Sequence, residues 1–213
     1  DFDNRGGNVV MDEKLYGYMN WPRIEAIVYG EEASPRDVMG PRITQDGVLV
    51  QGFFPDAEEV SVISGKKTYV CEKEDEAGCF AALLPVRKVP EYKFCVKIGE
   101  TVTESYDPYA FACQITEEEE KAFYAGVYYE AYKKLGAHPM AINGVKGTLF
   151  AVWAPNAISV NIAGDFNGWI GRATIMHRMP MSGIFELFVP GVEAGTHYKY
   201  EIKVKGGEVL LKA

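Results

Sequence analysis

One loop of the sequence combines an aromatic side chain with polar neighbours in a pattern suited to binding sugars. Residues 160–169 are VNIAGDFNGW, so a predicted strand ends at Gly164 and Trp169 lies in a loop rich in glycine and asparagine. The flat apolar face of an exposed indole matches the C–H face of a pyranose ring, and amide or ammonium groups can bond its hydroxyls. Asn167 is the nearest such amide. The alternative is that Trp169 folds back to cap the core of its own module.

A lysine on a later predicted strand is the second polar group of interest. Lys199 lies between Tyr198 and Tyr200. Successive side chains of a strand point to opposite faces, so we expect Lys199 to point away from its aromatic neighbours. By itself it would be an ordinary solvated lysine.

The sequence contains none of the compact catalytic motifs. It has no G-x-S-x-G, P-loop, G-x-G-x-x-G or H-E-x-x-H pattern. Acidic residues are plentiful, so a carboxylate pair for glycosidic chemistry stays formally open, but Asp165 has the position of a turn or cap residue. The four cysteines include no C-x-x-C pair, and the three histidines are isolated from one another. We therefore expect no catalytic residue, no metal site and no cofactor.

Composition limits the class of protein. The 213 residues are 47% hydrophobic and 24% charged, with a formal net charge of −8, as in an ordinary globular protein. The acidic balance argues against nucleic acid as a partner, and no apolar run reaches the roughly 18 residues of a membrane span. Cysteines packed in the reduced state favour a cytoplasmic location. The length suits one or two domains and is short of the about 250 residues of a (β/α)8 barrel.

An internal repeat organises the chain. Residues 47–63 (GVLVQGFFPDAEEVSVI) align with residues 147–163 (GTLFAVWAPNAISVNIA), and Tyr92-Lys93-Phe94 aligns with Tyr198-Lys199-Tyr200. Each copy is divided into short alternating runs separated by turn residues, as in antiparallel sandwiches. The predicted fold class is mainly β, with two immunoglobulin-like antiparallel β-sandwich modules joined by an α-helix.

The predicted domains follow from the repeat. We expect a tag or disordered leader at 1–11, a helical lead-in at 12–40, a first β-sandwich at 41–112, a linker helix at 113–139 and a second β-sandwich at 140–213. Thr116 and Glu119 predict a capping box, residues 117–120 a solvated acidic start, and Gly136 the end of the linker helix. Trp153 lies in an alternating strand, and we expect it in the core.

Several longer motifs then occur in a recognisable order: YEAYKKLGAHP at 129–139, GTLFAVWAPNA at 147–157, GDFNGW at 164–169, GIFELFVPG at 183–191 and YKYEI at 198–202, preceded by SYDPYAF at 105–111. Together they resemble the N-terminal part of bacterial glycogen branching enzymes, from about residue 34 to residue 213. Glycogen-debranching enzymes share the W-A-P-N-A and G-D-F-N-x-W elements. The LGAHP junction between two tandem modules favours the branching enzymes.

That resemblance implies two sandwich modules, the second a starch/glycogen-binding module of carbohydrate-binding module family 48, placed before a catalytic (β/α)8 barrel. The barrel is absent here, so no residue of this chain inherits a catalytic role. The family's reaction transfers an α-1,4-glucan chain to a 6-hydroxyl through a covalent intermediate. The implied partners are α-1,4-glucan (glycogen or maltooligosaccharides) and the protein's own barrel, with no nucleic acid or membrane. We expect a monomer.

The same resemblance suggests which residues touch glucan. Trp169 matches the stacking Trp of the family and Lys199 the lysine of its Y-K-[FY] strand; we add Asn167 as a hydroxyl-bonding neighbour. Related modules carry a second aromatic in the next hairpin, whereas residues 206–209 hold none. Residues 64–67 replace the Trp motif in the first copy, and we expect that copy to be structural or a much poorer binder. Two alternatives stay open: the N-terminal region of a debranching enzyme, and a standalone interaction module with Trp169 as its hot spot.

Overall fold

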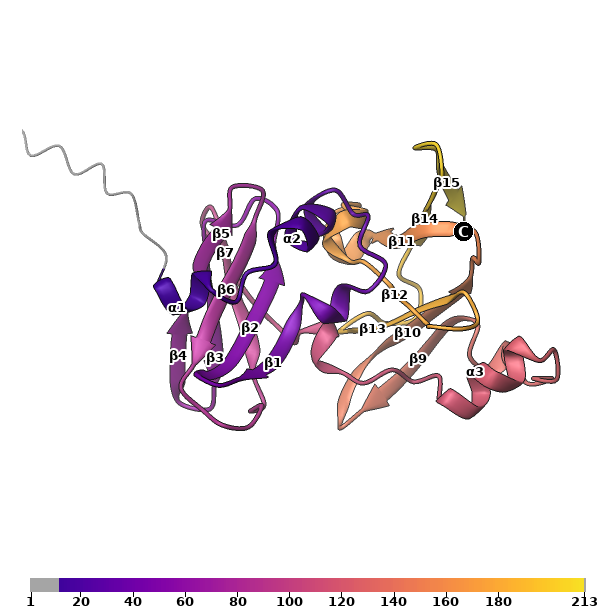
Figure 1. Cartoon of the computed structure of the whole chain (residues 1–213), viewed down its shortest axis with the longest axis horizontal. Helices are drawn as coiled ribbons and strands as arrows, with labels where there is room; N and C mark the ends of the chain where they lie inside the picture. Colours follow the sequence, from indigo (N-terminus) through magenta and orange to yellow (C-terminus); the bar gives the residue numbers. More distant parts are fainter. Residues whose placement is uncertain (1–11, 213) are drawn as a thin grey trace, which may run out of the picture.

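The chain forms two β-sheet modules that lie side by side along its long axis (Figure 1). The structure is a computed structural model that describes residues 12–212, so the leader expected at 1–11 lies outside the described residues. The strand pairs of the described part are antiparallel and form four sheets. The predicted fold class, mainly β with antiparallel sandwich modules, is confirmed.

Short helices precede the first module, as the helical lead-in predicted. Asn20 caps α2 by accepting a backbone N–H, and Pro22 occupies its first turn, where no backbone donor is required. Gly30 ends the helix with a φ of +65°, a conformation that glycine adopts without strain. The helices are α1 (Glu13–Tyr16), α2 (Trp21–Val28) and α3 (Glu117–Tyr124), with 3₁₀ turns η1 (Pro35–Asp37), η2 (Pro108–Ala110), η3 (Ala131–Lys133), η4 (Asp165–Asn167) and η5 (Gly171–Ala173).

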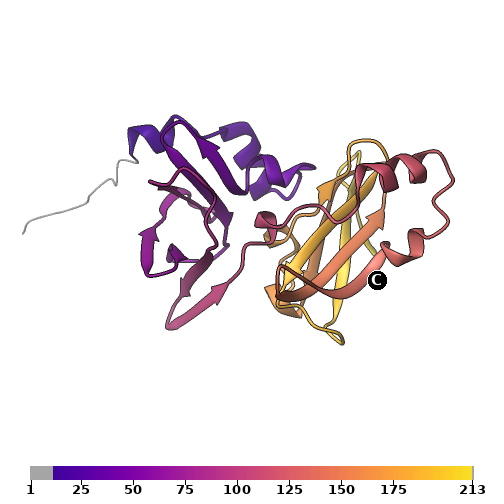
Figure 2. The ribbon, with the colours of Figure 1, turned by 90° about the horizontal axis from the view of Figure 1, so that it is seen from below.

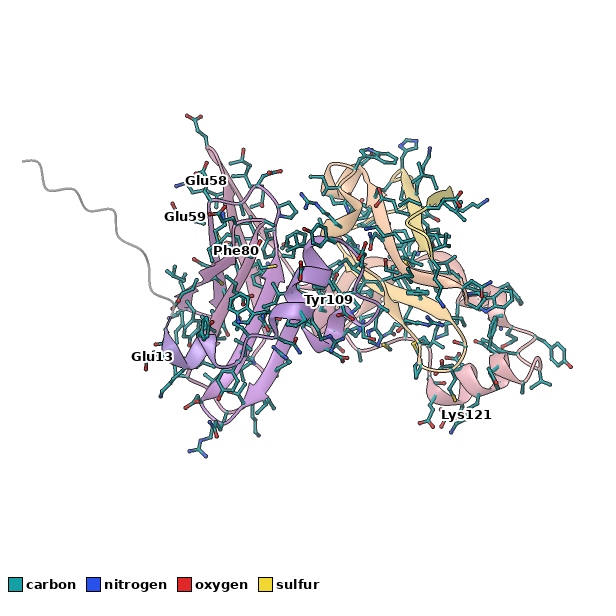
Figure 3. The ribbon with its side chains drawn as sticks, turned by 45° about the horizontal axis from the view of Figure 1, so that its top comes forward. Glu13, Glu58, Glu59, Phe80, Tyr109 and Lys121 are labelled. Atoms are coloured by element: carbon teal, nitrogen blue, oxygen red, sulfur yellow. The ribbon has the colours of Figure 1, made fainter. Side chains whose placement is uncertain are left out.

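Strands β1 to β8 form the first module as two four-stranded sheets, in the orders β1-β2-β6-β5 and β4-β3-β7-β8. Their inward side chains build a core around Phe80 and Phe94, and Phe80 lies among these strands in Figure 3. The sequence did not predict β1, β5 and β8, because these edge strands carry few apolar side chains. The bounds are β1 Gly40–Thr44, β2 Gly47–Phe53, β3 Glu59–Ser64, β4 Lys67–Val70, β5 Glu72–Asp75, β6 Cys79–Leu84, β7 Lys93–Ile98 and β8 Thr101–Ser105.

Strands β9 to β15 form the second module, with a sheet ordered β12-β13-β10-β9 and a three-stranded sheet ordered β11-β14-β15. Its core is centred on Phe150, Phe185 and Leu187, which are fully buried. The bounds are β9 Gly136–Ile142, β10 Val145–Trp153, β11 Ala157–Gly164, β12 His177–Arg178, β13 Ile184–Pro190, β14 Tyr198–Val204 and β15 Val209–Lys212.

Equivalent glycines show why the repeat preserves these positions. Gly47 and Gly147 each lie beside the end of a neighbouring strand, β6 or β13. A Cβ at Gly47 would lie 2.2 Å from the carbonyl oxygen of Leu84, and a Cβ at Gly147 would lie 2.5 Å from that of Val189. Both distances are far below van der Waals contact. The two modules therefore share a close backbone approach that only glycine permits.

The linker helix is shorter than predicted. It ends at Tyr124, because Gly126 adopts a φ of +74° and the Val127 N–H donates to the Ala122 carbonyl at 2.9 Å, the pattern of a Schellman motif. The extension of the helix to Gly136 was wrong, since Gly136 begins β9. The stop signal was present in the sequence at Gly126.

The start of the same helix is held by its acidic residues. Both bonds of the predicted capping box between Thr116 and Glu119 are present. Glu120 differs from the expectation of a solvated acidic run, because its side chain is buried. Its Oε1 accepts the backbone N–H groups of Met181 and Ser182 at 2.7 and 2.8 Å, and the Ser182 hydroxyl at 3.0 Å. This carboxylate fastens the linker helix to the second module.

Trp153 is not a core residue, and that prediction was wrong. Its side chain is 56% exposed, because alternation along β10 places Phe150 in the core and Trp153 on the outer face of the sheet. The indole N–H donates to the Ser182 carbonyl at 3.0 Å, and the Phe123 ring lies edge-on at 6.0 Å. The repeat-equivalent Phe53 also lies on an outer face. It is buried because the lead-in and the second module cover it.

The lead-in fills the junction between the two modules. Figure 1 shows α2 beside the chain segment that follows β11, and Figure 2 shows the linker leaving the first module and running along the second. An apolar cluster at this junction combines side chains from the lead-in and both modules: Ile24, Ile27, Val38, Met39, Phe53, Cys79 and Ile175. The modules are therefore joined by buried apolar contacts as well as by the chain itself.

Candidate functional site

The loop after β11 presents Trp169 to solvent. The loop begins where β11 ends at Gly164, passes through η4, and reaches Trp169, whose side chain is 46% exposed. Gly168 and Trp169 both have a φ of +63°. A left-handed backbone is uncommon for a tryptophan and is held here by the Trp169 N–H, which donates to the Gly164 carbonyl at 3.0 Å. The chain thus closes a tight turn that places the indole at the surface of the module.

Asn167 is part of the framework of this loop. Its Oδ1 accepts the Gly164 N–H at 3.0 Å, and its Nδ2 donates to the Ile162 carbonyl at 2.7 Å and to the Thr174 hydroxyl at 3.0 Å. These bonds occupy both amide donors inside the loop. The structure therefore gives Asn167 a role in holding the turn, and its expected contact with sugar hydroxyls stays a prediction.

Asp165 fixes the indole in one orientation. Its Oδ1 accepts the Trp169 Nε1–H at 3.1 Å, and its Oδ2 lies 3.1 Å from the His197 backbone N and 3.2 Å from the His197 Nδ1. The His197 backbone bond, together with the other bonds to this carboxylate, holds the pKa of Asp165 below its ordinary value. The turn or cap role of Asp165 is predictable from its neighbours, whereas its link to His197 is not, because only the pairing of β11 with β14 brings the two residues together.

Lys199 lies where the alternation predicted. It is exposed on β14 and pairs with Ala163, next to the end of β11, whereas the flanking Tyr198 and Tyr200 pack against the core. The next strand, β15, presents Leu211 on the same outer face, with 59% of its side chain exposed. The outer face beside the loop therefore combines an ammonium group with aliphatic surface, and residues 205–212, the turn and strand after β14, hold no aromatic residue.

The first module lacks an equivalent platform. Its Lys93 corresponds to Lys199, and the Lys93 ammonium lies 4.8 Å from the centre of the Tyr106 ring. The two-residue turn Gly65–Lys66 connects β3 directly to β4, where the second module has its Trp169 loop. That the first module is structural stays a prediction.

Residues 12–212 contain no group of three or more His, Cys, Asp or Glu side chains placed to hold a metal ion. None of their helices has the length and apolar character to cross a membrane. Their four cysteines are free, and burial raises the pKa of Cys71 and of Cys113 to about 12.

Two family models match the chain. The model described as alpha-1,4-glucan branching enzyme GlgB, N-terminal domain, matches residues 20–109, and the model described as Carbohydrate-binding module 48 (Isoamylase N-terminal domain) matches residues 134–213. The second match contains the whole Trp169 loop and Lys199.

Similar proteins named 1,4-alpha-glucan branching enzyme GlgB occur in several bacteria. That of Saccharophagus degradans is 38% identical over 88% of this chain and 26% of its own length. Those of Synechococcus sp. (strain CC9902) and Rhizobium meliloti are both 36% identical, over 84% and 92% of this chain and 23% and 27% of their own lengths. This chain thus spans about a quarter of the length of these relatives. It belongs to the 1,4-alpha-glucan branching enzyme family and corresponds to the N-terminal region of these proteins.

Proposed function

We propose that this chain holds α-1,4-glucan for a branching enzyme by stacking a pyranose ring on Trp169, with Lys199 bonding the sugar hydroxyls. The observation that carries the proposal is the exposed indole whose N–H is already bonded to Asp165, inside the segment that matches a carbohydrate-binding module. An aromatic face held in one orientation gives apolar contact to a sugar ring without the entropic cost of ordering the side chain on binding.

The site is shallow, so each glucan contact is weak. Such a contact still matters when the module is tethered to an enzyme, because tethering raises the local concentration of glucan chains near the reacting groups. The chain-holding role therefore does not require high affinity at a single site.

The activity of the whole protein forms the second part of the proposal. The catalytic (β/α)8 barrel lies in the remaining length seen in the relatives, and the full protein is a cytoplasmic, monomeric enzyme. It transfers α-1,4-glucan chains to 6-hydroxyl groups by retaining chemistry. In this chain, Trp169 and Lys199 bind glucan and neither takes part in bond cleavage.

Electrophoresis of the native chain through gels with and without glycogen tests the proposal. We expect glycogen to retard the unaltered chain, and Trp169→Ala to weaken the apparent affinity by about tenfold or more, because the stacking platform is removed. Trp153→Ala is the matched control, since Trp153 is also an exposed tryptophan but lies outside the Trp169 loop. Equal migration of the unaltered chain in both gels would rule out glucan binding by this region.

A further inference from the structure

The backbone at Trp169 needs support from both sides of its loop. A left-handed conformation is unfavourable for a non-glycine residue, so it persists only where the surrounding structure holds it. On the N-terminal side, β11 provides that support through the bond from the Trp169 N–H to the Gly164 carbonyl. The C-terminal side depends on residues 171–176, which follow the loop.

Gly171–Ala173 form the 3₁₀ turn η5, and Ile175 then pairs with Asn161 of β11 as an isolated antiparallel bridge. The Ile162 N–H donates to the Thr174 carbonyl at 2.9 Å, and the Met176 N–H donates to the Val160 carbonyl at 2.8 Å. Thr174 also accepts the Asn167 side chain, so this segment is bonded directly to the Trp169 loop. The backbone groups on one edge of the segment are therefore hydrogen-bonded within the second module.

The backbone groups on the other edge of the segment are hydrogen-bonded by the first module. The Tyr109 hydroxyl accepts the Ile175 N–H at 3.0 Å and donates to the Ile175 carbonyl at 3.0 Å, so that one phenol bonds both backbone groups of the residue. Tyr109 lies in η2 at the end of the first module and is labelled at the junction of the modules in Figure 3. Ile175 is 1% exposed and belongs to the apolar cluster that includes Phe53 of the first module.

The lead-in adds a second attachment. The carbonyls at the C-terminal end of α2 are bonded by the second module: Arg172 donates to Val28 at 3.3 Å, and Ser159 donates to Gly30 at 2.7 Å. Basic groups are favourable at this end of a helix. The Arg172 guanidinium also lies 5.8 Å from the centre of the Phe53 ring. Arg172 is only three residues from Trp169, so the first module and its lead-in reach almost to the platform.

Gly30 shows how closely these parts fit. A Cβ at Gly30 would lie 2.7 Å from the Asn161 Nδ2 and 3.2 Å from the Arg172 Cβ. The backbone of the lead-in therefore lies directly against β11 and against the segment after the Trp169 loop.

We propose that the first module and its lead-in restrain the conformation of the Trp169 loop. Tyr109 bonds the backbone of Ile175, and Arg172 attaches the same segment to Phe53 and to the lead-in. Tyr109, Arg172 and Phe53 are positioning residues that keep Trp169 in its exposed, left-handed conformation. The first module contributes to glucan binding through the second module, without a sugar platform of its own. The consequence for affinity rests on the proposed function, whereas the consequence for the conformation of Trp169 does not.

Tyr109→Phe in the full chain tests this, because it removes the hydroxyl and keeps the ring. Trp21→Phe and Trp153→Phe leave Trp169 as the single fluorescent indole of the chain's three. We expect Tyr109→Phe to increase iodide quenching of Trp169, lower its fluorescence anisotropy and weaken maltoheptaose binding by about fivefold, within the range typical of coupled sites. Tyr128→Phe is the matched control, since it removes a tyrosine hydroxyl that bonds Glu119 in the linker.

The result that would overturn the proposal is a folded Tyr109→Phe variant with the same Trp169 quenching, anisotropy and maltoheptaose affinity as Tyr128→Phe. If Tyr109→Phe does not fold, Arg172→Ala replaces it and is matched by Arg178→Ala, whose guanidinium contacts Phe185 at 5.8 Å within the second module. Unchanged quenching in Arg172→Ala then overturns the proposal. If the unaltered chain does not bind maltoheptaose, the proposed function fails, while Trp169 quenching still decides whether the first module restrains the Trp169 loop.

Discussion

The Asp165 carboxylate bonds the Trp169 indole N–H with one oxygen, at 3.1 Å, and the His197 backbone N–H with the other, also at 3.1 Å. The first bond orients the exposed ring, and the second ties it to the start of β14, two residues before Lys199. A single carboxylate therefore connects the aromatic platform to the strand that carries the lysine.

Asp165→Ala should weaken glucan binding without removing either proposed contact residue. The freed indole would have to be ordered on binding, which costs about 0.5–1.5 kcal/mol and corresponds to roughly a two- to tenfold loss of affinity. Titration of the chain with maltoheptaose, followed by fluorescence, measures it. Glu193→Ala is the control for loss of one exposed carboxylate. An unchanged affinity in Asp165→Ala would show that the indole needs no such anchor.

Glu74 should make stability depend on pH near neutrality. Burial raises its pKa to about 7 from an ordinary value of 4.5, despite the Gln51 amide that bonds both oxygens. Between those values the folded chain binds a proton at Glu74 that the unfolded chain has lost, so the contribution of Glu74 to stability is fully present below pH 4.5 and is lost as pH rises through 7.

Urea unfolding at pH 5 and at pH 8 checks this expectation. The free energy of unfolding should fall by up to about 3 kcal/mol over that interval. Glu74→Gln should reduce the fall, and the exposed Glu76→Gln should leave it as in the unaltered chain. The same pH dependence in Glu74→Gln would contradict the assignment to Glu74.

Glu120 should contribute far more to stability than its helix neighbour Glu117. Glu120→Ala leaves the buried donors of Met181 and Ser182 without their acceptor, which should cost about 3 kcal/mol. Glu117→Ala removes an exposed, solvent-screened ion pair with Lys121 and should cost far less. Urea unfolding followed by Trp153 fluorescence measures both variants. Equal losses would show that Glu120 does not anchor the linker helix.

Alanine at the equivalent glycines should destabilise both modules. The Cβ of Gly47→Ala or Gly147→Ala would collide with a backbone carbonyl, and we expect each to cost about 3 kcal/mol. Gly65→Ala has open space around the new Cβ and a φ of +58°, so it should cost only about 1 kcal/mol. Thermal unfolding compares the three. A loss at Gly147→Ala no greater than at Gly65→Ala would contradict the role of close approach.

Local sequence signals predicted the features whose causes are themselves local. The capping box at Thr116 and Glu119 depends on residues one helical turn apart, and the strand alternation that turns Lys199 outward depends on its immediate neighbours. The repeat also predicted two modules of antiparallel strands. The sequence carries two possible stop signals for the linker helix, Gly126 and Gly136, and the helix ends before the first of them.

Tertiary structure decided what covers each outward face. Phe53 and Trp153 occupy equivalent strand positions, yet Phe53 is buried by the lead-in and the second module, whereas Trp153 contacts Phe123 and Ser182 and stays largely exposed. Likewise, Asp165 and His197 meet only because β11 pairs with β14. The sequence of one strand specifies which side chains share a face, but burial depends on elements far away in the chain, and periodicity carries no information about them.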